Sequence, residues 1–136
     1  MTPEQKVLIR QTWAEIVPVA DTTAALFYGR LFVIDPPARR LFGSKDMRVQ
    51  GNQFMQMLSI FVRSLDDLVT MEPALESLGR RHTGYGVLPS DYDGVGRALL
   101  WAVEQVLGEG FNEPVREAWA EAYRTLAATM QRAVPA

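Results

Sequence analysis

Apolar residues recur along most of the chain at spacings of three and four residues, the period of an amphipathic helix. The alternation that predicts strands is missing from the sequence, and prolines, glycines and capping residues mark the ends of the apolar segments. The pattern predicts an all-α chain of six helices, with one short early turn and short loops. The predicted segments are 3–16, 19–33, 37–41 (the turn), 47–65, 71–83, 90–107 and a last helix beginning near 113.

Some residues have the chemistry expected of helix ends and helix crossings. Thr2, followed three residues later by Gln5, has the pattern of a capping box, and Ser90 is predicted to cap a later helix. Gly51 lies inside a predicted helix, where glycine costs about 1 kcal/mol relative to alanine. Either Gly51 lets this helix cross closely over the helix that carries Ala24, or it lies near a frayed end and costs little.

Composition and charge narrow the possible classes of protein. With 136 residues, 48 % of them hydrophobic, the chain is expected to form one domain, residues 1–136, with a sizeable core. The absence of cysteine excludes disulfides and thiol nucleophiles. The net charge is −2 with both signs interspersed, and no apolar run reaches the length of a membrane span, so we expect neither nucleic-acid nor membrane binding. No signal-peptide pattern opens the sequence, and a cytoplasmic location is expected.

The single histidine, His82, is the main candidate for chemistry. It follows Leu78 by four residues, so both side chains share one helix face, and Gly84 and Gly86 suit the end of that helix. An isolated inward-facing histidine is most often a core or capping residue. The alternative is a metal ligand, and one histidine suffices only where a cofactor supplies the other ligands, as haem does.

The spacing of other residues around His82 favours the haem alternative. Pro36 is followed six residues later by Phe42, Gln50 precedes His82 by 32 residues, and Tyr92 follows it by ten. In this order and spacing the whole chain resembles the bacterial single-domain haemoglobins, which are related to the globin domain of flavohaemoglobins.

The resemblance implies a fold, a cofactor and a set of site residues. The fold is a globin fold, a three-over-three helical sandwich with the D helix reduced or absent. The cofactor is haem b, with His82 as the ligand of the iron and Tyr28 and Gln50 on the opposite, distal side. The other residues expected to contact haem are Phe42, which stacks on the ring, Leu78 beneath it, and Phe54, Val87, Tyr92 and Arg81.

Tyr28 and Gln50 also have an ordinary structural explanation. Both lie among apolar residues and need hydrogen-bond partners if they are buried, so they could satisfy each other in a plain core. In a haem pocket they are a pair of donors to a bound ligand. Gln53, one turn further on, is the alternative distal residue, with a direction nearer the pocket rim.

The proximal side departs from the family pattern. In flavohaemoglobin-like proteins a tyrosine at the place of Tyr92 works with a glutamate of the last helix, and here the matching place falls near Val134. The charged proximal triad is therefore not expected. Arg80 and Arg81 either pair with haem propionates or form a solvated helix face.

Three functions follow as hypotheses. The first is high-affinity binding of O2, and also of CO and NO, at a five-coordinate haem iron. The second is the oxidation of nitric oxide to nitrate, which needs a reductase; since the chain ends at Ala136, we expect a separate one. The third is a haem-free sensor or interaction module with the same fold.

Overall fold

The computed structural model describes residues 1–132, which are helical over most of their length and contain no strand. The elements are α1 (Pro3–Ile16), η1 (Val17–Val19), α2 (Ala20–Ile34), η2 (Pro36–Leu41), α3 (Met47–Arg63), α4 (Leu68–Gly84), α5 (Pro89–Leu107), η3 (Gly108–Gly110) and α6 (Glu113–Arg132), the η elements being 3-10 helices. All the predicted helices are present.

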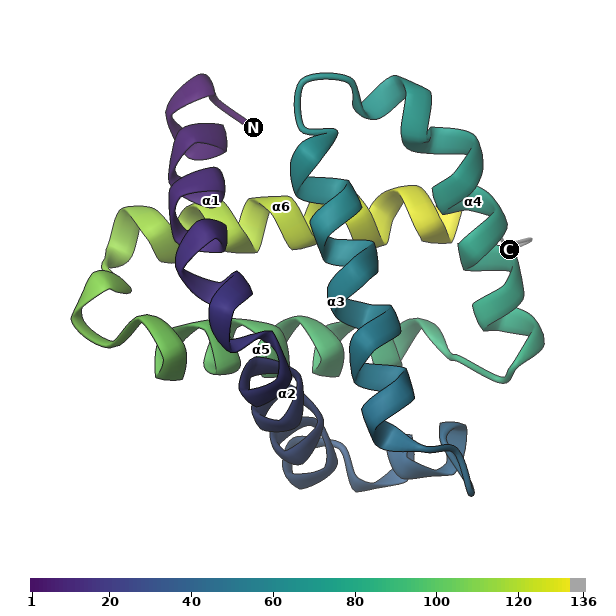
Figure 1. Ribbon diagram of the computed structural model, residues 1–136. Helices are drawn as coiled ribbons and strands as arrows, with labels where there is room; N and C mark the ends of the chain where they lie inside the picture. Colours follow the sequence, from purple (N-terminus) through teal and green to yellow (C-terminus); the bar gives the residue numbers. More distant parts are fainter. Residues whose placement is uncertain (133–136) are drawn as a thin grey trace.

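The helices cross in two layers. α1 and α3 lie in front of α5 and α6 and run across them, while α4 lies at the end of α6 (Figure 1). α2 packs mainly against α5 and α3, while α1 and α4 pack against α6. No regular helix forms between η2 and α3, so the chain passes directly from the short 3-10 turn into α3.

The predicted cap of α1 forms, whereas the predicted cap of α5 does not. The Thr2 hydroxyl accepts from the Gln5 N–H and the Gln5 side chain accepts from the Thr2 N–H, so the capping box is confirmed. The prediction that Ser90 caps α5 is wrong. α5 begins one residue earlier, at Pro89, and the Asp91 carboxylate reaches back to accept the Leu88 N–H at 2.7 Å.

The predicted start of α4 is also wrong. The helix begins at Leu68 rather than at residue 71, directly after Asp67. Pro73 lies inside α4, where its ring nitrogen has no hydrogen to donate to the carbonyl of Val69. The helix therefore contains a proline in its second turn and still forms without that hydrogen bond.

The core takes large side chains from all six helices, and a buried hydrogen bond joins α1 to α6 within it. The buried Trp119 of α6 donates through Nε1 to the Thr12 hydroxyl at 2.9 Å, and that hydroxyl donates to Leu8 O of α1. The stretch Pro3–Ile34 contains a segment that is long and apolar enough by composition to cross a membrane. It consists of two helices separated by η1, and residues from both helices belong to this core.

Two glycines allow the closest helix crossings. A Cβ at Gly51 would lie 3.0 Å from the Cβ of Ala24, so the α2–α3 crossing occurs at the two small residues expected. A Cβ at Gly79 would collide with the main-chain carbonyl oxygen of Met130, because α4 and α6 touch backbone to backbone there. Apart from Gly79, the only buried residue of α4 is Leu75, so this contact largely determines where the helix lies.

We expect Gly79→Ala to destabilise the protein by about 3 kcal/mol, because overpacking against a main chain cannot be relieved by a side-chain rotation. Chemical denaturation of the two proteins measures this difference. Gly84→Ala is the matched control, since Gly84 lies in the same helix with open space where its Cβ would be. Equal stability of the two variants would contradict a backbone-to-backbone contact.

Candidate functional site: a pocket with one histidine

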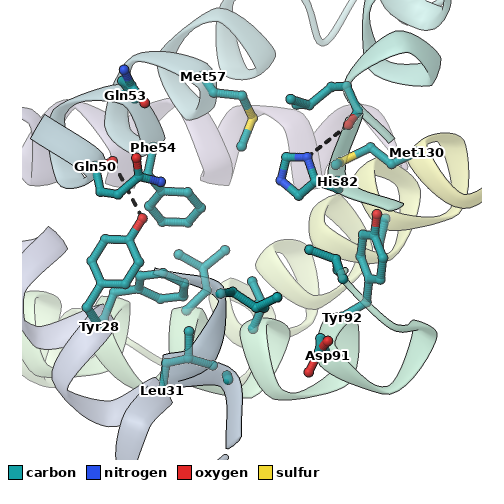
Figure 2. A pocket seen from close by; sticks show the side chains of 18 of the residues that line it. Tyr28, Leu31, Gln50, Gln53, Phe54, Met57, His82, Asp91, Tyr92 and Met130 are labelled. Carbon is teal, nitrogen blue, oxygen red and sulfur yellow. Dashed lines mark hydrogen bonds between the residues drawn. The ribbon is translucent and has the colours of Figure 1, made fainter. Parts of the chain in front are cut away.

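A cavity of about 380 Å³ opens between α2, α3, α4, α5 and α6, and its walls are mostly apolar. All the haem-contact and distal candidates named from the sequence line it, whereas Arg80 is exposed on α4 and does not. Figure 2 shows His82 on one side of this space and Tyr28, Gln50 and Phe54 on the other. The candidates that line it are Tyr28, Phe42, Gln50, Gln53, Phe54, Leu78, Arg81, His82, Val87 and Tyr92.

His82 is held in a single orientation by its own helix. Nδ1 lies 2.8 Å from the carbonyl oxygen of Leu78, and since a carbonyl only accepts, Nδ1 carries the proton. Nε2 then keeps its lone pair, and the ring extends from α4 into the pocket (Figure 2). The partner of this ring nitrogen is thus a main-chain carbonyl of its own helix.

The electrostatics of the pocket favour neutral His82. Burial lowers the pKa of His82, and the positive charges of Arg81 and Lys45 lower it further, against an opposing effect of the hydrogen bond to Leu78. Neutral imidazole is the form that binds a metal.

The side chains of the pocket suit a metal ion whose other ligands come from a cofactor. Within residues 1–132 no three His, Cys, Asp or Glu side chains come together as a metal site. A slot with apolar walls and one inward imidazole is instead the arrangement that suits haem, whose porphyrin supplies four nitrogens. The residues present therefore fit this cofactor.

The wall opposite His82 carries the polar pair. The Tyr28 hydroxyl donates to the main-chain carbonyl of Gln50 over a long distance, 3.5 Å, rather than to its side chain. The two side chains thus do not satisfy each other, as a plain core would require. Burial raises the pKa of Tyr28 to about 12, so this hydroxyl stays protonated and able to donate.

Aromatic rings hold this wall in place. Phe54 stacks on Phe27 with ring centroids 4.3 Å apart, and Phe42 meets Tyr28 edge-on at 5.3 Å. Phe42 also meets Phe32 edge-on at 5.6 Å. Tyr28 is therefore fixed between neighbours, with its hydroxyl directed towards α3 (Figure 2).

Tyr92 lies on the His82 side of the pocket and has an unusual hydroxyl. That oxygen is buried and has no hydrogen-bond partner among residues 1–132, and burial raises its pKa. Its main-chain carbonyl accepts the Tyr123 hydroxyl at 2.5 Å. The place of the family glutamate, near Val134, lies outside the described residues.

Several pocket residues were missed from the sequence. Lys45 lies at the pocket, Met57 and Met130 lie near His82 (Figure 2), and Asp91 is a buried carboxylate paired with Arg40. Asp91 could have been found, because an acid at the third position of a helix commonly reaches back to the preceding N–H. The two methionines carry no comparable signal, since methionine fills core gaps in many folds.

Comparison with known proteins places this pocket in a family. Residues 25–130 match the globin family. The neuroglobin of Tetraodon nigroviridis is 29 % identical over 97 % of this chain and 91 % of its own length. A flavohemoprotein of Xylella fastidiosa is 32 % identical over 90 % of this chain, which corresponds to 31 % of the flavohemoprotein.

A solved structure extends the match to three dimensions. An engineered carbene transferase, described as a putative nitric oxide dioxygenase from Rhodothermus marinus, superposes with a TM-score of 0.86 and 25 % identity. The superposition covers 97 % of this chain and 92 % of that one.

A pocket between crossing helices, with one imidazole directed into it, defines a haem-binding helical protein. The chain belongs to the globin family. The predicted globin fold is confirmed, and membership of the family implies haem and small gaseous ligands.

We expect His82→Gly to weaken haem binding by at least tenfold, because a metal–nitrogen bond is lost, and imidazole added to the buffer to restore it. Hemin titration followed at the Soret band, with and without imidazole, measures this. Arg80→Gly is the control, since it adds a glycine to the same helix at an exposed place. Unchanged haem affinity in His82→Gly would exclude His82 as the ligand.

Proposed function

We propose that this protein binds O2 with high affinity, and also CO and NO, at a five-coordinate haem b. His82 is the proximal ligand, and Tyr28 and Gln50 donate hydrogen bonds to the gas on the distal side. The haem iron supplies the gas-binding position and gives electron density to the ligand. The single observation that supports the proposal most is the pair of polar side chains facing His82 across an apolar pocket.

The long hydrogen bond of Tyr28 supports its role as a donor. At 3.5 Å the bond to Gln50 O is well beyond the ordinary range for a hydroxyl, so little is lost when the hydroxyl turns to a better acceptor. Its raised pKa, about 12, keeps the proton in place at any physiological pH. Gln50 lines the same pocket, and its side-chain amide has two hydrogens to donate.

Two such donors have a large effect on the release of the gas. A hydrogen bond to an acceptor with anionic character contributes about 1.5–3 kcal/mol, and about 1.4 kcal/mol corresponds to a factor of ten. Two donors therefore slow O2 release by roughly two decades or more. A globin with this pocket holds O2 rather than unloading it quickly.

We expect Tyr28→Phe to raise the O2 dissociation rate by about ten- to hundredfold, because it removes one donor and keeps the ring packing. Stopped-flow displacement of O2 by CO measures the rate. Gln50→Leu is expected to act in the same direction. Gln53→Leu is the matched control, one turn along the same helix.

An unchanged rate in Tyr28→Phe would overturn the assignment of this donor. A larger effect of Gln53→Leu than of Gln50→Leu would move the second donor to Gln53. No Soret band after addition of hemin to the wild-type protein would leave the haem-free interaction module as the function.

A second candidate is nitric oxide dioxygenase activity, favoured by the similarity to a putative nitric oxide dioxygenase and to a flavohemoprotein. The reaction NO + O2 + e⁻ → NO3⁻ consumes one electron in each turnover. A reductase is therefore needed, and we propose a separate protein. The cytoplasmic location expected from the sequence belongs to this proposal, because such reductases draw on reduced nucleotides.

For this activity we expect one equivalent of nitrate when the oxygenated protein meets NO, and many equivalents only with a reductase and its electron donor. Nitrate is measured after rapid mixing. A single equivalent even with an efficient reductase would contradict the enzyme and leave O2 binding. Tyr28→Phe is expected to lower the nitrate yield at low O2, because O2 is lost before NO can react with it.

A further inference from the structure

A single arginine joins three segments at the edge of the pocket. The Arg40 guanidinium donates to Pro37 O of its own turn at 2.7 Å and to Gly86 O at 3.4 Å. It also donates to the Asp91 carboxylate at 3.0 Å. These contacts connect η2 to the loop that follows α4 and to the first turn of α5, segments that are far apart in the sequence.

The carboxylate that receives Arg40 is buried and has a second task. The Asp91 side chain is only 6 % exposed, while that of Arg40 is 42 % exposed. The same oxygen, Oδ2, accepts the Leu88 N–H at 2.7 Å. Asp91 lines the pocket as well, so one buried carboxylate of α5 accepts hydrogen bonds from the residue before the helix and from η2.

Each segment joined in this way carries a wall of the pocket. Phe42 follows Arg40 by two residues and lies against Tyr28. Val87 lies between Gly86 and Leu88, the two residues held by Arg40 and Asp91, and its N–H donates to His82 O. The pair therefore links the segment with Phe42 to the segment that follows His82.

We propose that Arg40 and Asp91 form a clamp that closes the edge of the haem pocket and slows the loss of the cofactor. The clamp acts by position, since it fixes Phe42 and Val87 relative to each other across the pocket edge. This inference rests on the proposed function only because it takes haem to be the molecule bound in the pocket.

The clamp also keeps a charge from acting on the pocket. Asp91 is one of the residues that line the cavity, and the Arg40 guanidinium balances its carboxylate. Removing either partner leaves one uncompensated charge beside the cofactor. A negative charge stabilises the oxidised, more positive iron and a positive charge stabilises the reduced iron, so the two single variants shift the reduction potential in opposite directions.

The experiment compares Asp91→Asn, Arg40→Gln and the double variant with the wild type. Haem loss is measured by transfer of hemin to an excess of an acceptor apoprotein, and the midpoint potential by spectroelectrochemistry. The unfolding of each apoprotein is measured in denaturant. Arg97→Gln is the control, because it breaks an exposed ion pair with Asp93 on the same helix.

We expect all three clamp variants to lose hemin about tenfold faster, and the control to match the wild type. Asp91→Asn is expected to raise the midpoint potential and Arg40→Gln to lower it, with the double variant returning close to the wild type. Arg40→Lys keeps the charge without the forked contacts, so its potential stays while hemin loss rises. Arg40→Lys also tests the clamp if one of the other variants does not fold.

Hemin loss at the wild-type rate in these variants would overturn the clamp. So would a fall in apoprotein stability that accounts for the whole change in hemin loss, because the pair would then be an ordinary structural contact. Both results differ from failure of the proposed function, in which the wild-type protein itself binds no hemin.

Discussion

The contact between α4 and α6 at Gly79 is the constraint on which the site depends. α4 has few buried side chains, and it lies where it does because its backbone touches the backbone of Met130. His82 is one turn further along the same helix, so its position follows from that contact. Its direction comes from a second short-range interaction, the hydrogen bond from Nδ1 to Leu78 O. Gly79 and the hydrogen bond of His82 together direct an imidazole nitrogen into the pocket.

The polar groups of the pocket are satisfied unequally, and the pattern has a chemical meaning. The proton of His82 is firmly bonded, whereas the Tyr28 hydroxyl makes a long bond and the Tyr92 hydroxyl has no partner among residues 1–132. Buried hydroxyls without good partners destabilise a protein on its own, so they point to something that the pocket holds. The group that fixes the direction of the imidazole is thus well bonded, whereas one hydroxyl on each side of the pocket is left available to an occupant.

The sequence predicted the helices because their apolar stripes, capping residues and breaks agree with one another. It placed the pocket through the spacing of Phe42, Gln50 and His82, and the folded chain brings all three to one cavity. It failed at two helix starts: α4 begins before Pro73, a residue that usually interrupts a helix, and Asp91 rather than Ser90 accepts the N–H that precedes α5. Contacts between distant segments, such as Arg40 with Asp91, have no periodic pattern, so only the folded chain reveals them.

The shallow burial of α4 has a consequence for how the protein matures. A helix that buries only Leu75 and Gly79 gains little from the core, and Pro73 removes one of its internal hydrogen bonds. The local opening of such a helix requires less free energy than global unfolding. A cofactor lodged against it adds the missing apolar contact and stabilises the closed form by mass action. Supply of haem in the cell would then act as a late folding step, and chains that never receive it would be the ones most open to proteases.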